Sequence, residues 1–184
     1  MTPPPFPAEA IAAARDAAKA HLRIASADED ALIETQAAAA LALCESFTGA
    51  AMIAREWHET APADGRWTRL AMGPVQGIAG VEGLADDGTA IVLPAEAYAV
   101  DIDAAGDGWV RAHRSAGEHR VAIRYLAGSG ESWEALPAPV RQGVVLLAAH
   151  LFNARPGSAA PPAAIAALWR PFRRMRLSAE RGRC

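Results

Sequence analysis

His58 and Glu59 are the first pair of side chains in this 184-residue sequence that could do acid–base or metal chemistry. No second histidine follows at helical spacing, so the HExxH pattern of zinc hydrolases is absent. Ser129 lies between Gly128 and Gly130 without the G-x-S-x-G spacing of a nucleophile elbow, which favours a turn. The sequence also lacks a phosphate-binding P-loop and a GxGxxG motif. We therefore predict no catalytic residue, no metal site and no cofactor.

The remaining candidates for chemistry are isolated. Cys44 and Cys184 are too far apart in sequence for a CxxC redox pair, and they do not indicate a disulfide framework. His150 lies next to Leu151 in an apolar helical pattern, where a hydrogen-bonded, partly buried histidine is the default. An uncharacterised small enzyme with a site in the central segment remains an alternative. Substitution of His58, His113, His119 and His150 one at a time would test it.

The C-terminal segment combines guanidinium groups with large apolar side chains. A solvated chain end needs no such apolar residues, whereas a segment that folds into a groove on a partner does. In a groove, the apolar side chains are buried and the arginines pair with carboxylates or phosphates. A frayed terminus is the alternative. The predicted interface residues are Trp169, Arg170, Phe172, Arg173, Arg174, Met175, Arg176 and Leu177.

Charge is distributed unevenly. Residues 170–184 contain six arginines and one acid, a net charge of +5, while the other residues carry twelve basic and twenty acidic side chains, a net charge of −8. An acidic body argues against a dedicated nucleic-acid-binding surface, because such a surface needs a basic face. A small nucleic-acid-binding module that uses only the basic tail remains an alternative.

Two features concern the location of the protein. No run of 18 or more apolar residues occurs, so we predict no membrane-spanning helix. The N-terminal residues MTPPPFPAEA lack the basic start and apolar stretch of a signal peptide. We expect a soluble protein that is intracellular when made.

Helical periodicity occurs towards both ends of the chain. Apolar residues at steps of three and four predict helices over residues 8–23 and 28–48, the second ending at Gly49. Ser26 and Glu29 have the spacing of a capping box for that second helix. A further long helix is predicted after Pro137, and a short one over 163–169.

The middle of the chain has the pattern of a β structure. Short apolar runs separated by Gly, Pro and Asp predict an antiparallel meander. Three of the five tryptophans would fill its core, which leaves Trp133 and Trp169 as the better interface candidates. The predicted strands are Met52–His58, Arg66–Ala71, Gly77–Val81, Ala90–Leu93, Tyr98–Asp103, Gly108–Ala112 and His119–Leu126.

The predicted fold class is α+β: a mainly helical core of about four helices, with an inserted antiparallel β meander and an extended C-terminal tail. Residues 1–50 and 128–168 would form the helical core and residues 51–127 the β insert. Residues 169–184 would form the basic tail.

The order of several loose motifs resembles the head–tail connector proteins, also called adaptor or head-completion proteins, of long-tailed phages and gene transfer agents. The resemblance covers residues 20–176. It departs from the family at Ser129, where an aromatic residue is common, and beyond Leu177. The motifs are Leu70-x-x-x-Pro74-Val75-x-x-Ile78-x-x-Val81, Tyr98-x-Val100-Asp101, Val121-x-Ile123-x-Tyr125-x-Ala127-Gly128, Leu136-Pro137 with Val140-Arg141-Gln142, Leu146-Leu147-x-x-His150-x-x-Asn153-x-Arg155, and Leu168-x-x-Pro171-x-Arg173.

The resemblance implies a structural role. Members of the family form a homo-oligomeric ring, commonly of twelve copies, between the portal protein and a neck, stopper or tail-terminator protein. The ring extends the channel for double-stranded DNA, which passes without specific binding, and C-terminal segments dock on the portal. By this resemblance, residues 169–184 would bind the portal. The protein would be in the bacterial cytoplasm during assembly and then in the particle neck, with no role for a membrane.

Overall fold

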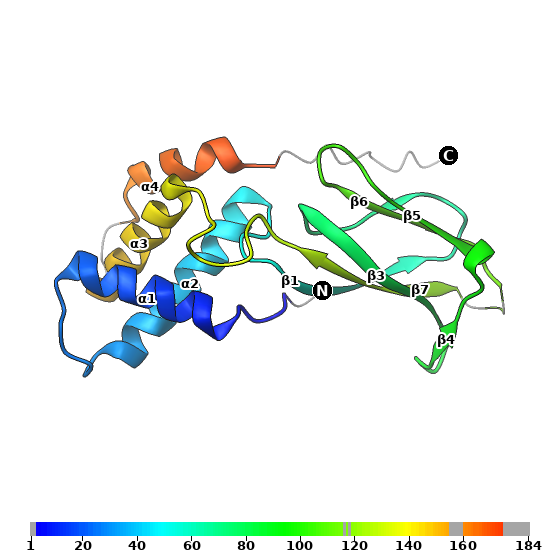
Figure 1. The fold of residues 1–184 in the computed structure, drawn as a ribbon, viewed down its shortest axis with the longest axis horizontal. Coiled ribbons are helices and arrows are strands. Elements are labelled where there is room, and N and C mark those ends of the chain that lie inside the picture. The colour runs from blue at the N-terminus through cyan, green and yellow to red at the C-terminus, as the bar shows by residue number, and fades with distance from the viewer. Residues whose placement is uncertain (1–2, 116, 118, 155–159, 175–184) are drawn as a thin grey trace.

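The computed structural model is elongated, with the helices at one end and the strands at the other (Figure 1). It describes residues 3–115, 117, 119–154 and 160–174. We call the helical end the helical half and the strand-bearing end the β half. The two halves meet at residues 49–54 and 128–137, which we call the junction. An α+β fold is confirmed.

Four α-helices build the helical half. Helix α1 buries alanines at steps of four, and α2 ends at Gly49, whose φ of 67° is the left-handed conformation expected there. Trp133, Leu136 and the inner faces of all four helices enclose one apolar core. The helices are α1 (Ala8–Leu22), α2 (Asp30–Thr48), α3 (Ala138–Asn153) and α4 (Ala163–Trp169), followed by the 3-10 turn η2 (Arg170–Phe172).

The predicted capping box is wrong. Helix α2 begins at Asp30, its N-cap is Glu29, and no side chain caps it. Asp30 instead forms an ion pair with Lys19 of α1. Asp30 at the start of α2 therefore links the two helices, and its negative charge also interacts favourably with the dipole of α2.

All seven predicted strands are present, within a few residues of their expected bounds. They form two antiparallel sheets, with strand orders β1-β7-β3-β4 and β2-β6-β5. Only β3–β4 and β5–β6 are neighbours that also follow one another in the chain, so the described strands do not form a simple meander. Side chains from both sheets share one core. The strands are β1 (Arg55–Pro62), β2 (Thr68–Arg69), β3 (Val75–Leu84), β4 (Ala90–Val92), β5 (Tyr98–Ile102), β6 (Gly108–Ala112) and β7 (Arg120–Ala127), with the 3-10 turn η1 (Ala95–Ala97) before β5.

The tryptophans are placed differently from the prediction. Trp133 and Trp169 are buried in the helical core, with 5% and 3% of their surface exposed. Only Trp57 is fully buried in the β half, whereas Trp67 is 45% exposed beneath the guanidinium of Arg111. Both indoles are therefore largely covered within the single chain, Trp169 because α4 packs on α3. A contact of Trp133 or Trp169 with a partner stays a prediction.

Candidate assembly surface

The segment from α4 to Arg174 is the part of the predicted interface that the structure describes. Met175, Arg176 and Leu177 lie outside the described residues. Trp169 fixes this segment to α3: its indole N–H donates to the Val140 carbonyl at 3.2 Å. A Cβ atom at Gly143 would lie 2.2 Å from the Trp169 Nε1 atom, so the close approach of α4 depends on glycine in α3.

Arg173 and Arg174 continue the attachment beyond α4. The Arg173 guanidinium lies over the Phe47 ring at 5.4 Å. The backbone N–H of Arg174 donates to the Thr48 carbonyl at the end of α2, at 2.7 Å. Both arginines therefore contact this chain within the single subunit, and their contact with a partner stays a prediction.

The Arg174 side chain reaches the β half. Its guanidinium forms an ion pair with Asp107 at 3.0 Å and donates to the Ala105 carbonyl, both in the turn between β5 and β6. It passes Gly73, where a Cβ atom would lie 2.4 Å from Arg174 Nη1. Arg174 thus binds to both halves of the molecule, from α2 to the β5–β6 turn.

An ion pair and hydrogen bonds within the β half hold the β5–β6 turn in place for this contact. Asp107 also pairs with Arg69 of β2 at 3.3 Å. The Trp109 indole N–H donates to Asp103 at 3.0 Å, and the backbone N–H of Asp107 donates to the same carboxylate. These hydrogen bonds, Trp109 first, lower the pKa of Asp103 below its usual range, and the nearby Arg174 charge acts in the same direction.

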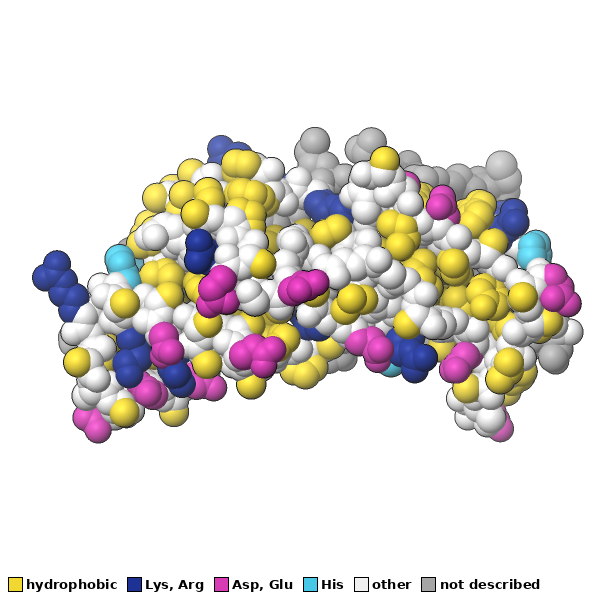
Figure 2. Space-filling view, in the orientation of Figure 1, with side chains coloured by type: hydrophobic (Ala, Val, Ile, Leu, Met, Phe, Trp, Pro, Cys, Tyr) yellow, Lys and Arg dark blue, Asp and Glu magenta, His cyan; other side chains and the backbone are white. Residues whose placement is uncertain are grey.

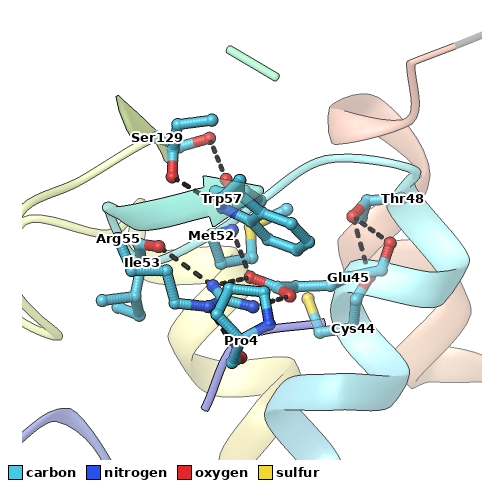
Figure 3. A network of polar contacts seen from close by, with 11 residues as sticks. Pro4, Cys44, Glu45, Thr48, Met52, Ile53, Arg55, Trp57 and Ser129 are labelled. Atoms are coloured by element: carbon cyan, nitrogen blue, oxygen red, sulfur yellow. Dashed lines mark hydrogen bonds and ion pairs between the residues drawn. The ribbon is translucent and has the colours of Figure 1, made fainter. Parts of the chain in front are cut away.

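A buried ion pair lies at the junction (Figure 3). Arg55 at the start of β1 donates to both Glu45 carboxylate oxygens, at 2.8 and 2.7 Å, and both residues are less than 9% exposed. The Met52 backbone N–H donates to Glu45 at 2.7 Å. Such a bidentate, fully hydrogen-bonded pair is the geometry in which a buried charge is tolerated.

The same arginine also binds the N-terminal segment. Arg55 Nε donates to the Pro4 carbonyl at 3.1 Å. The guanidinium lies 4.3 Å from the centre of the Phe6 ring and 4.5 Å from that of Trp57. Residues near both termini are therefore attached close to the junction, the N-terminal ones through Arg55 and the C-terminal ones through Arg174.

The Gly128-Ser129-Gly130 sequence crosses the junction. A Cβ atom at Gly128 would lie 2.3 Å from the Ala54 backbone, so glycine is needed for two chain segments to pass. Ser129 donates from its backbone N–H and its hydroxyl to the Ala51 carbonyl, at 2.9 and 3.1 Å. This confirms the expected turn and gives Ser129 a structural partner rather than a base.

The residues that could support an enzymatic alternative are not brought together. His58 is 69% exposed and contacts Glu56, while His113 and His119 lie on exposed loops and His150 is on α3. An open depression of about 500 Å³ on the β half is lined by His58, Thr60 and Glu82 among others. Across the described ranges, no group of three or more His, Cys, Asp or Glu side chains is placed to hold a metal ion. Nor does any helix in those ranges have the length and apolar character to cross a membrane.

Comparison with known proteins gives a consistent class. No protein-family model and no curated protein matches the sequence. Several chains of solved structures do match. A chain in the neck of an empty gene transfer agent particle, computed with C6 symmetry, is 28% identical, with a TM-score of 0.77 over 98% of this chain and 100% of that one.

The other two structures belong to native particles. A chain in the neck computed with C12 symmetry is 27% identical, with a TM-score of 0.72 over 98% of this chain and 100% of that one. A chain of the native virion is 28% identical, with a TM-score of 0.68 over 92% of this chain and 91% of that one. The fold thus defines a class, the structural proteins of virion necks. Within it, the resemblance to the head–tail connectors of phages and gene transfer agents is confirmed.

Proposed function

We propose that this chain is the subunit of a ring-shaped adaptor between the portal and the tail of a phage or gene transfer agent particle. The observation that carries the proposal is the match along the whole length of a neck protein, at 28% identity and a TM-score of 0.77. The neighbours come from necks computed with sixfold and twelvefold symmetry, which supports a homo-oligomeric ring. We take twelve copies as the working number.

The charge distribution fits a channel. Outside residues 170–184 the net charge is −8, so the ring would repel the DNA that passes through it rather than hold it. The ring would lengthen the DNA channel of the portal and present a platform to a stopper or tail-terminator protein. No step of this role needs catalysis.

The C-terminal segment would bind the portal. Since Trp169, Arg173 and Arg174 contact this chain, we place the portal contact on the residues from Met175 onward. The sequence beyond Arg174 still contains three arginines, together with Met175 and Leu177. This composition suits a segment that buries apolar side chains and pairs its arginines with acids of the portal.

Truncation after Arg174 tests the portal contact. This truncation keeps Trp169 in the core and Arg174 on Asp107, so the shortened chain should melt within a few degrees of the full chain. We expect it to fail to join portal-bearing heads in an in vitro attachment assay. Replacement of Arg176, Arg181 and Arg183 by glutamine in the full chain distinguishes the contribution of the charges to attachment from the contribution of the length of the segment. Normal attachment of the truncated chain would contradict the portal contact.

A further inference from the structure

An apolar groove of about 380 Å³ lies between α2 and α4. Leu43, Phe47, Leu147 and Ile165 line it, with Trp169 at its base. Leu43 is 49% exposed, as is Leu32 near the start of the same helix, whereas Ile33 and Leu41 of α2 are buried. In the space-filling view, hydrophobic side chains gather over the α4 side of the helical half (Figure 2).

The outer face of α2 beside this groove carries no charge. A surface helix normally has charged side chains on its solvent side. The only charged residues of α2 are Asp30 and Glu34 near its start and Glu45, which is buried. The exposed positions of the helix are instead Ala31, Leu32, Thr35, Ala42, Leu43 and Ser46.

Positive charge lies at the end of the groove. Arg170 is exposed directly after Trp169, and Arg173 lies over Phe47, which lines the groove. Within the described part of the chain, neither arginine pairs with an acid, whereas Arg174 pairs with Asp107. A matching occupant would therefore present small or apolar side chains together with acids.

Helix α1 presents such a face on the other side of the helical half. Its buried alanines are Ala10, Ala14 and Ala18, so the opposite face carries Glu9, Ala12, Asp16 and Ala20. Helix α1 packs on α2 and α3, and α4 packs on the same two helices, which places α1 and α4 diagonally across the bundle (Figure 1). Glu9 and Asp16 are separated by about 10 Å along the helix axis. Asp16 also forms a surface ion pair with Arg15 of its own helix at 2.9 Å.

We propose that α1 of a neighbouring copy of this chain occupies the α2–α4 groove, with its Glu9 and Asp16 facing Arg170 and Arg173. The inference rests on the proposed ring, because a ring needs two different faces of each subunit to meet head to tail. The alanines of α1 let two helices approach closely, and the acids meet the two arginines that the described residues place at the groove. The contact is a helix-in-groove interface repeated at each step around the ring.

Charge reversal with rescue tests the pairing. Arg170→Glu with Arg173→Glu places acids at both faces, and Glu9→Arg with Asp16→Arg places arginines at both. We expect either pair to lower the occupancy of the ring on portal-bearing particles by at least about tenfold. The chain with all four substitutions should recover most of the occupancy. Arg66→Glu with Arg114→Glu, two exposed arginines of the β half, is the matched control and should have no effect.

Thermal melting of the isolated variant chains distinguishes a folding defect from loss of the contact between subunits. The α1 variant alters exposed residues, and loss of the surface ion pair between Asp16 and Arg15 should cost little stability. This variant therefore stays informative even if loss of the Arg173–Phe47 contact destabilises the other variant. Normal ring occupancy in both reversed variants, or no recovery with all four substitutions, overturns the proposal. Such a result leaves the proposed function intact, because the portal-contact test uses the chain ending at Arg174 and does not depend on this groove.

Cross-linking identifies the occupant directly. Leu43→Cys with Ala12→Cys, in a Cys184→Ser background, should give a ladder of covalently linked copies on the particle after mild oxidation. Leu43→Cys alone should give none. A cross-link from residue 43 to the portal protein in place of the ladder would show that the groove takes the portal and would overturn the proposal.

Discussion

The two halves of this molecule differ in the size of the side chains that pack their interiors. In the helical half, the interfaces of α1 and α2 are built from alanines such as Ala14, Ala18 and Ala37, all at most 1% exposed. In the β half, large side chains fill the space between the sheets, with Trp57, Ile123 and Tyr125 also at most 1% exposed. Close-packed small residues tolerate no added volume, whereas large ones tolerate no loss of it. The same difference explains why the helical half is suited to pack against further helices.

The junction should be the point where a single change destabilises both halves. Arg55→Ala leaves the Glu45 carboxylate buried without its ion partner, and we expect a loss of about 3–5 kcal/mol in the free energy of unfolding, measured in urea. Replacing both residues by methionine should cost less than removing Arg55 alone, because no buried charge then remains unpaired. An equal or larger loss in the double variant would contradict this account.

Opposite changes of volume should separate the two halves. Ile123→Ala in the β core should cost about 2–5 kcal/mol through the cavity it leaves, measured by urea unfolding. Ala14→Leu, which adds volume between helices, should cost about 1–3 kcal/mol. If α1 accepted leucine at position 14 without loss, the helical half would not be closely packed.

A change at the contact between α3 and α4 should have a smaller, local effect on stability. Gly143→Ala puts a methyl group where the Trp169 ring lies, and we expect a loss of about 1–3 kcal/mol together with a shift of tryptophan fluorescence. Gly77→Ala is the matched control in the β half, because nothing lies within 4 Å of the added methyl group. The control should stay within about 0.5 kcal/mol of the unchanged chain.

The smallest expected effect is a change with pH at the β5–β6 turn. The pKa of Asp103 is lowered in the fold, so its contribution to stability is present above its unfolded pKa of about 3.9 and is lost as the pH falls through its folded value. The indole N–H resonance of Trp109 should therefore shift only below about pH 4. Asp103→Asn should abolish the shift. A midpoint at or above the unfolded value would contradict the assigned hydrogen bonds.

Local patterns predicted the elements well. Alternation in the sequence around Ile123 and periodicity along α1 and α2 are set by neighbours in the chain, and so is the end of α2 at Gly49. The division of the strands into two sheets depends on long-range pairing, such as β1 with β7, and periodicity does not encode it.

The site residues were predicted only in part. The tail was identified from composition, but the inward contacts of Trp169 and Arg174 depend on Gly143 and Gly73, glycines far away in the sequence. The Glu45–Arg55 pair was missed, although one signal was present. Glu45 follows Leu41 by four residues on the inner side of α2, where an acid needs a partner.

The attachment of Arg174 has a mechanical consequence. A pull on the chain beyond this residue enters the molecule near its middle, where the Thr48 carbonyl and the Asp107 carboxylate share the load. Both contacts must yield before tension can peel α4 away from its end. The subunit would therefore carry such a load into both of its halves rather than unravel from its last helix.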